Sequence, residues 1–282
     1  MPRRKISWEI AGFFLFLTIA SVAGLWWEWY HFHWQTIVLA VAMYLLCGFS
    51  ITVYYHRGIT HKSFKMARSL QYVMAILSTG ALLLPARKWR MRHEDHHQFT
   101  DDPQLDPNCA RAGFWGSLDV HIGQVICSRY QDRLIATDLS VDPVELWQAK
   151  WYWPMAVSVG FIMPIALASL WDDAIGGFLV ASCQRMWLQY NGAFLVNSAA
   201  HSALFGTKPL GHWSSATNLS FQGWRLFVSP LFVVLSLGEV LGHLFHHKRQ
   251  ASWDTGWWRV NPTSLLILAF ERLGLVWDLR EY

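Results

Sequence analysis

Four long, mainly apolar runs alternate with polar segments along the chain, beginning at Ile10, Trp34, Trp153 and Ala174. Each run is close to the roughly 20 residues that a helix needs to cross a bilayer. Trp and Tyr flank most of the runs, as expected where aromatic rings lie at the level of the lipid headgroups. The pattern predicts an all-α integral membrane protein with four transmembrane helices, over about 10–30, 34–55, 153–171 and 174–196.

Shorter apolar stretches follow Ser69, Gly223 and Thr263 in the more polar parts of the chain. The first two are short for a membrane span, so we expect interfacial or re-entrant helices there. No repeat or flexible linker divides the sequence. We therefore expect a single domain over 1–282, in which two helical hairpins carry a helical cap formed by 56–150 and 197–282.

Basic residues are unevenly distributed between the connecting segments. The joint between runs one and two and the joint between runs three and four contain no Lys or Arg, whereas the remaining polar segments hold nearly all of them. The positive-inside rule predicts that both termini and the cap are cytoplasmic. The net charge of +4 reflects this asymmetry and does not indicate nucleic-acid binding. The four cysteines show no spacing typical of zinc, iron–sulfur or disulfide sites.

Eight of the thirteen histidines fall into three clusters on the predicted cytoplasmic side. In "HEDHH" and "HLFHH", the spacing i, i+3, i+4 places three imidazoles on one helical face, and "HRGITH" adds two more. Neutral imidazole is a common metal ligand, and this number of nitrogen atoms exceeds what one ion binds. Two metals are therefore implied, with the candidate ligands His56, His61, His93, His96, His97, His243, His246 and His247.

An all-imidazole set suits zinc, copper, iron and nickel. Structural zinc usually has four ligands, often thiolates, and no cysteine is suitably placed. Copper commonly recruits Cys or Met as well. A redox-active iron pair fits the number and type of ligands best.

Acidic residues accompany the second histidine cluster. On a helical wheel Asp95 points away from the imidazole face and Glu94 lies on its flank, so neither is an expected ligand. The acidic residues that follow are expected to hydrogen-bond the far nitrogens of metal-bound imidazoles, with a solvated loop as the alternative. These residues are Asp101, Asp102 and Asp106.

The order and spacing of several motifs resemble the membrane fatty acid desaturase family, and within it the Δ9 (stearoyl-type) acyl desaturases. The resemblance runs from about Tyr54 to the C-terminus and rests on "HRGITHKSF", "HEDHHQFTDDPQLDP", "GFWGS", "VNSAAHSALFGTKP", "GE…HLFHH" and "RLGLVWDLR". It implies that the eight clustered histidines and His201 bind two irons, and that Asn197 reaches one iron through a water. Glu239 of the "GE" pair joins the three aspartates as an expected support of the ligands.

Two features depart from the family pattern. "GEVLGHLFHH" has one extra residue before His243, which predicts an offset or a bulge at Gly242, and Leu244 stands where the family has Asn. Glu94 and Asp95 replace residues that are often basic in the family. Upstream basic residues could instead meet a phosphate-bearing acyl carrier, although ordinary cytoplasmic surface charge is an equal alternative. They are Arg87, Lys88, Arg90 and Arg92.

The resemblance implies an oxygen-dependent enzyme that introduces a cis double bond, at the Δ9 position, into a saturated acyl chain. Its cofactor would be two non-haem irons, with O₂ as co-substrate. The chain has no "HPGG" haem motif and no ferredoxin-type cysteine set, so an external donor of the ferredoxin or cytochrome b5 type is expected to supply electrons. The acyl carrier stays open between CoA, acyl-carrier protein and a glycerolipid.

Two other functions were weighed. A di-iron membrane hydroxylase acting on a lipid or alkyl chain is the alternative, because the same ligands serve both reactions. A metal transporter would place acidic or histidine side chains at mid-bilayer depth, and the first three apolar runs contain none.

The other polar residues in or near the membrane are expected to have structural roles. His31 and His33 lie on the side opposite the cap, and His121 and His212 are expected in a loop or core. Arg185, inside the fourth run, is expected to pair with an acidic residue of the cap.

Overall fold

The computed structural model describes residues 5–102, 104–109, 113–128, 142–202, 204–206, 215–254 and 261–281. In the first hairpin, α1 (Trp8–Tyr30) begins after Ser7, whose hydroxyl accepts a hydrogen bond from the Ile10 N–H. The second helix, α2 (Trp34–Phe49), continues without a break into the π-helical segment η1 (Ser50–Thr60). This continuation carries the helix beyond the predicted end at about residue 55 and into the cap.

The second hairpin begins earlier than predicted. Its first helix comprises α7 (Pro143–Val157), η3 (Ser158–Ile162), α8 (Met163–Ala168) and η4 (Ser169–Trp171). Asp142 caps it by accepting a hydrogen bond from the Val144 N–H, and Pro143 occupies the first turn, where it costs no hydrogen bond. The return helix comprises α9 (Ala174–Phe178), η5 (Leu179–Gln184) and α10 (Arg185–Ser198).

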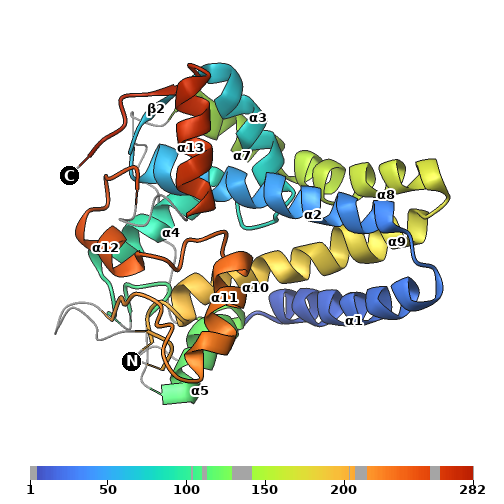
Figure 1. Ribbon diagram of the computed structural model, residues 1–282, viewed down its shortest axis with the longest axis horizontal. Helices are drawn as coiled ribbons and strands as arrows, with labels where there is room; N and C mark the ends of the chain where they lie inside the picture. Colours follow the sequence, from blue (N-terminus) through green and yellow to red (C-terminus); the bar gives the residue numbers. More distant parts are fainter. Residues whose placement is uncertain are drawn as a thin grey trace.

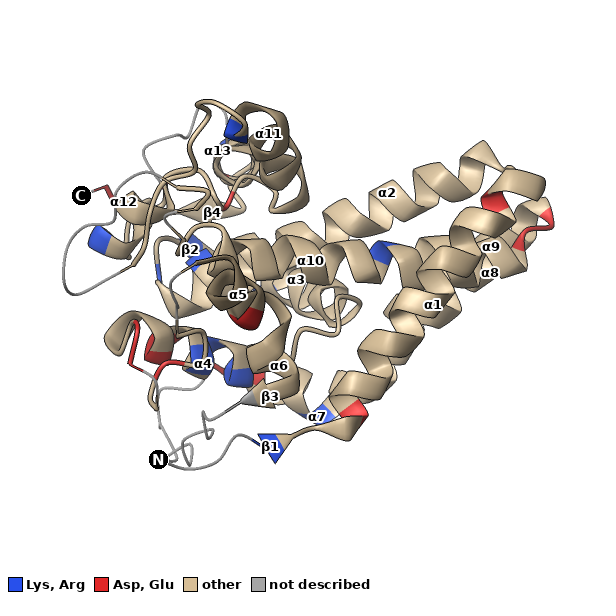
Figure 2. Cartoon of the chain, turned by 90° about the horizontal axis from the view of Figure 1, so that it is seen from below, with Lys and Arg blue, Asp and Glu red and all other residues tan. Residues whose placement is uncertain are grey.

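Three helices in the described residues are long and apolar enough to cross a membrane: Trp8–Tyr30, Trp34–Thr60 and Pro143–Trp171. The chain is therefore an integral membrane protein. The two hairpin turns lie at the same end of the stem, opposite the cap (Figure 1). Figure 2 shows acidic but no basic positions at these tips, whereas most basic positions lie in the cap.

The prediction that Arg185 pairs with an acidic residue is wrong. Its guanidinium is buried and donates to the carbonyl oxygens of Gly80, Gly160 and Ala181 and to the Gln189 side chain. Gly80 stands at the end of α3, and Gly160 and Ala181 lie in the π-helical segments η3 and η5, so backbone dipoles solvate the cation.

The cap surrounds η1 with short elements: α3 (Arg68–Thr79), α4 (Ala86–Gln98), α5 (Gly113–Leu118), η2 (Asp119–Gly123), α6 (Gln124–Ile126), α11 (Arg225–Leu235), α12 (His243–Lys248) and α13 (Pro262–Arg272). Exposed apolar side chains such as Phe227 and Leu231 mark one side of α11, in line with an interfacial helix. An apolar core with Val53, Tyr54 and Tyr55 packs beneath the histidine-bearing helices.

Among the described residues the regular structure is helical apart from two small antiparallel strand pairs, which the sequence pattern did not predict. β1 (Lys5–Ile6) pairs with β3 (Cys127–Ser128), and β2 (Lys65–Met66) pairs with β4 (Val276–Trp277). They fasten the start of α1 and the end of the described chain to the cap.

Candidate metal centre

The structure brings all nine candidate histidines together in two groups. The five-histidine group contains His56, His61, His93, His97 and His246, and the four-histidine group contains His96, His201, His243 and His247. Within each group the ligand atoms lie within 4.8 Å of one another. No other group of three or more His, Cys, Asp or Glu in the described ranges is arranged in this way.

Each helical triplet divides between the two groups. On α4, His93 and His97 are four residues apart and enter the five-histidine group, while His96 enters the other. On α12 the assignment is reversed, because His243 and His247 enter the four-histidine group and His246 the other. Residues i and i+4 lie one above the other on a helix, and i+3 is rotated to their side. The repeated spacing therefore lets two helices bridge two sites.

The remaining ligands come from η1 and from the end of α10. His56 lies on η1, and His61 follows its last residue. His201 lies in the turn beyond α10. Gly242, where the extra residue predicts an offset or a bulge, has a φ of 69° and is the N-cap residue of α12. This left-handed turn reorients the chain so that the triplet faces the two groups.

The nitrogen geometry suits metal binding. His56 Nε2 and His246 Nε2 are 2.9 Å apart, and His93 Nε2 lies 3.1 Å from both His61 Nε2 and His97 Nε2. Two ligands at right angles with bonds of about 2.1 Å stand roughly 3.0 Å apart. His247 Nε2 is buried without a hydrogen-bond partner in the protein, which leaves its lone pair for a metal. The residues therefore fit a pair of imidazole-bound ions.

Burial favours the neutral form of several of these imidazoles. Burial first, and repulsion between neighbouring rings second, lowers the pKa of His93, His97, His201, His246 and His247 well below the usual value. For His243 the same causes lower the pKa to about 3. Only the neutral ring has a lone pair for a metal, so the site is prepared for ions at neutral pH.

A buried carboxylate supports the five-histidine group. Glu239 Oε2 lies 2.9 Å from His56 Nδ1, and Glu239 Oε1 accepts a hydrogen bond of 2.7 Å from Arg57. Burial alone would raise the pKa of Glu239, but Arg57 and His56 outweigh it and lower this pKa to about 2. The carboxylate therefore fixes the His56 proton on Nδ1 and turns Nε2 to the site.

Aspartates support the four-histidine group. Asp106 Oδ1 lies 2.9 Å from His96 Nδ1, while Asp101 reaches His201 indirectly, through the Ser215 hydroxyl. Asp102 differs from the prediction, because it accepts hydrogen bonds from the backbone N–H groups of Gln104 and Leu105. Its Oδ1 atom therefore stabilises the turn that follows Asp102 and does not contact a histidine ring in these bonds.

Other residues near the site were not predicted from sequence. The Trp89 ring stacks on His93 with centroids 4.8 Å apart, and Arg57 links Glu239 to the Trp253 carbonyl and to Ser264. Arg57 stands directly after His56, and Trp89 four residues before His93. Only this spacing could have pointed to them.

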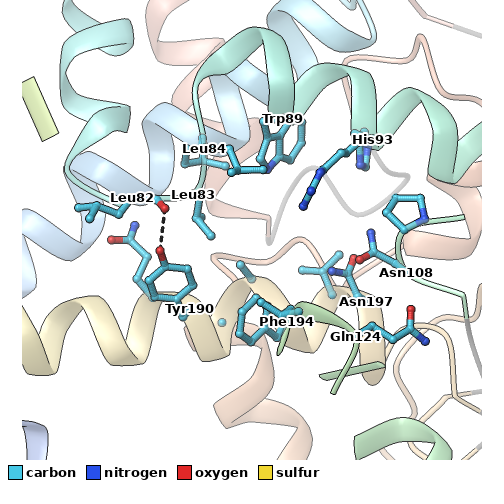
Figure 3. A pocket seen from close by; sticks show the side chains of 18 of the residues that line it. Leu82, Leu83, Leu84, Trp89, His93, Asn108, Gln124, Tyr190, Phe194 and Asn197 are labelled. Atoms are coloured by element: carbon cyan, nitrogen blue, oxygen red, sulfur yellow. Dashed lines mark hydrogen bonds between the residues drawn. The ribbon is translucent and has the colours of Figure 1, made fainter. Parts of the chain in front are cut away.

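A cavity of about 1030 Å³ runs past the five-histidine group (Figure 3). His56, His93 and Asn197 reach its wall, and Asn108 and Gln124 line its cap side. Mainly apolar residues line the stem side, including Leu82, Leu83, Leu84, Tyr190 and Phe194. Such a cavity suits a long apolar molecule with a polar end.

The four basic residues proposed for a headgroup are placed differently. Arg92 lines the cavity. Arg90 is buried and pairs with Glu145 at 3.2 Å, which excludes it as a headgroup ligand. Arg87 and Lys88 lie on the same helix but not in the cavity wall.

The remaining predicted residues lie outside the two groups. Glu94 is exposed and Asp95 is buried, and neither joins the histidine groups. His121 has a core role, since its ring contacts Ser198 Oγ and Asn191 Oδ1. His31 stacks on Trp27 near the hairpin turn, and His212 lies outside the described residues.

Comparison with known proteins agrees with this site. No family model matches the chain. It is 30% identical to the Delta(9)-fatty-acid desaturase fat-7 of Caenorhabditis elegans, over 98% of this chain and 80% of that protein. It is also 30% identical to a Delta-9 desaturase-like 5 protein of Arabidopsis thaliana, over 89% and 79%, and to a probable acyl-CoA desaturase of Schizosaccharomyces pombe, over 88% of this chain and half of that protein. The resemblance of the motifs is thereby confirmed, and the chain belongs to the Δ9 fatty acid desaturase family.

Proposed function

We propose that the protein is an oxygen-dependent acyl desaturase that introduces a cis double bond, at the Δ9 position, into a saturated acyl chain. The observation that carries this proposal is the contact between the two features of the site: the five-histidine group, one of two imidazole groups held side by side on α4 and α12, borders a mainly apolar cavity. The named relatives are desaturases, so the hydroxylase alternative is not favoured.

Two non-haem irons are the proposed cofactors, one in each histidine group, and Asn197 would reach one of them through a water. When bound, the iron pair would activate O₂ and remove one hydrogen from each of two adjacent carbons. Supporting this choice, the described residues offer the groups imidazole nitrogens and no thiolate.

The protein's own part is to position the chain and exclude water. Leu83, Leu84 and Phe194 contact the alkyl chain, and Trp89 holds the His93 ring from the side of the cavity. The polar end of the substrate would lie near Arg92, Asn108 and Gln124, where an acyl carrier can remain in water. Alignment of the reacting carbons with the metals then selects the bond that is oxidised.

We also propose four membrane spans, with Ala174–Ser198 as the fourth, and a cytoplasmic cap. The return helix is long enough to span, and its polar residues Arg185 and Gln189 face the interior of the bundle. An external ferredoxin or cytochrome b5 would supply electrons from the cytoplasmic side.

Lipid analysis tests the proposed function. The chain is expressed in a host lacking Δ9 desaturase activity, supplied with iron and a reductant system. New cis monoenes are expected with the unaltered chain and with His121→Ala, whose histidine lies outside both groups, but not with His96→Ala. Products that gain an oxygen would favour a hydroxylase, and absence of any new product would overturn the proposal.

A further inference from the structure

A short segment without any candidate metal ligand contacts two of the three parts of the chain that supply the four-histidine group, the turn after α10 and the start of α12. We call Ser215–Asn218 the bridge segment. Ser215 Oγ lies 3.0 Å from His201 Nδ1, and the Thr217 N–H donates to the Ala200 carbonyl at 2.7 Å. At its other end, Asn218 Oδ1 accepts a hydrogen bond of 3.1 Å from the Leu244 N–H on α12.

The protons of Ser215 can be placed from its partners. Both Asp101 carboxylate oxygens face it, at 2.7 Å from the Ser215 nitrogen and 2.8 Å from Oγ. A carboxylate only accepts, so the single hydroxyl proton of Ser215 points to Asp101. Ser215 Oγ can then only accept from His201 Nδ1, which must carry the ring proton. The lone pair of His201 therefore lies on Nε2, the atom 2.9 Å from His243 Nε2 and 3.3 Å from His96 Nε2.

Asn218 supplies a cap that α12 lacks. The residue at the N-cap is Gly242, which has no side chain to accept a hydrogen bond. The Leu244 N–H lies at the second helical position, where an N-cap side chain usually bonds. Asn218 replaces that side chain from a distant part of the sequence and so aligns the helix that carries His243 and His247.

The bridge segment is itself tightly packed. Ala216 and Thr217 are fully buried. A Cβ atom added at Gly206 would lie 1.5 Å from Thr217 Oγ1, so glycine is needed for this close approach. Gly206 also forms a backbone bridge with Leu219, directly after the segment. Ser215 is thus held in a fixed place next to His201.

We propose that Ser215 is a positioning residue that controls metal binding in the four-histidine group alone, by orienting His201. This inference rests on the proposed metal pair. The five-histidine group has a separate support in Glu239, which hydrogen-bonds His56 and Arg57, on elements other than the bridge segment. Loss of a hydrogen-bond partner of a metal-bound histidine typically weakens metal affinity by about 10–100-fold.

Anaerobic titration of the purified, metal-free chain with Fe²⁺, in competition with a chelator, tests the inference. The unaltered chain should bind two ions, and Ser215→Ala should bind one ion with unchanged affinity and the other about 10–100-fold more weakly. Ser215→Thr keeps the hydroxyl and should restore two ions. Ser229→Ala is the matched control, because it removes a buried serine that bonds only the Ser220 carbonyl.

The possible failures are distinguishable. Two ions bound with unchanged affinity by Ser215→Ala, or equal weakening of both, would overturn the role of Ser215 while leaving the metal pair intact. Fewer than two ions in the unaltered chain would overturn the metal pair itself. Equal loss of the second ion in Ser229→Ala would show a general packing effect and would also overturn the inference.

Discussion

Among single residues, Glu239 combines two tasks that are usually separate. It holds the ring of His56 and balances the charge of Arg57, which is 2% exposed. Removal of one partner from a buried ion pair leaves an uncompensated charge and typically costs about 3–5 kcal/mol. The same carboxylate therefore links folding of the cap to the metal site.

Glu239→Gln is expected to lower both stability and metal affinity. The amide cannot balance Arg57, and one of its two polar atoms is a donor, which conflicts with a donor from His56 or Arg57. We expect a loss of about 3 kcal/mol in the free energy of unfolding. We also expect a lower affinity for the ion bound by the five-histidine group. Thermal unfolding and Fe²⁺ titration measure these effects. Glu94→Gln, at an exposed position on α4, should change neither value.

Tyr44 lines the stem end of the cavity. On α2 and η1 it is the lining residue farthest from His56, and its hydroxyl bonds the Leu235 carbonyl across the cavity wall. Gln189 Nε2 lies 3.5 Å from the Tyr44 carbonyl and completes this wall. The length available to an acyl chain beyond the metals therefore depends on this side chain.

Tyr44→Ala should shift the substrate preference toward longer chains. Each methylene accommodated in an apolar pocket changes specificity by roughly tenfold or more. Competition between two saturated substrates of different length, followed by analysis of the monoene products, measures the shift. Tyr72→Ala serves as the control because Tyr72 is half-exposed and packs against Trp147, away from the cavity. An unchanged product ratio would contradict this account of the cavity end.

Residue spacing predicted the clustered histidines, but only some of the residues that hydrogen-bond and orient them. His93 and His96 stand in a triplet with a helical period, and His201 followed from the resemblance. Ser215 is invisible to such reasoning, because it lies 14 positions from His201 and only the folded chain brings them together. Arg90 could not be separated from its basic neighbours, since its partner Glu145 is on another helix.

Among the elements, α10 and α11 are in close contact at Gly192. A Cβ atom at this position would lie 2.0 Å from the Leu235 carbonyl oxygen and 2.8 Å from the Tyr44 hydroxyl. Glycine thus permits a three-helix contact beside the cavity, between α2, α10 and α11. Backbone atoms cannot move aside as a flexible side chain can, so the two helices would have to separate.

Gly192→Ala is expected to destabilise the protein by about 1–3 kcal/mol despite the better helix propensity of alanine. Gly12→Ala is the matched control on α1, where nothing lies within 4 Å of the added Cβ. Removal of a helical glycine there should stabilise by about 1 kcal/mol or less. Thermal unfolding in detergent compares the two variants, and equal effects would contradict the close helix contact.

Hydrophobic runs predicted the elements of the stem because lipid contact requires continuous apolar sequence. The limits of the cap elements depend on local contacts instead. The helix at Pro143 starts ten residues before the apolar run at Trp153, since Asp142 provides a cap that hydropathy does not detect. Strands of two residues, such as Lys5–Ile6, are defined only by their partner.

For the whole molecule, the distribution of charge and the arrangement of the hairpins indicate the same orientation across the membrane. Described basic residues gather in the cap, whereas the hairpin tips carry Glu28, Asp172 and Asp173 (Figure 2). Asp173 joins the two hairpins at this end by accepting hydrogen bonds from Trp27 and Thr36. We therefore expect both turns on one side of the membrane and the histidine groups on the other.

Labelling of introduced cysteines tests this orientation and the fourth span together. His31→Cys and Asp172→Cys place thiols at exposed positions on the two tips, and Lys248→Cys places one on the cap. A membrane-impermeant maleimide added to intact cells should label the two tips, and it should label Lys248→Cys only after permeabilisation. The unaltered chain gives the background, because Cys47, Cys109 and Cys183 are buried and Cys127 is half-buried.

Labelling of the cap in intact cells would contradict the cytoplasmic position of the metal centre. Opposite accessibility of the two tips would instead contradict the pairing of the hairpins and the span over Ala174–Ser198.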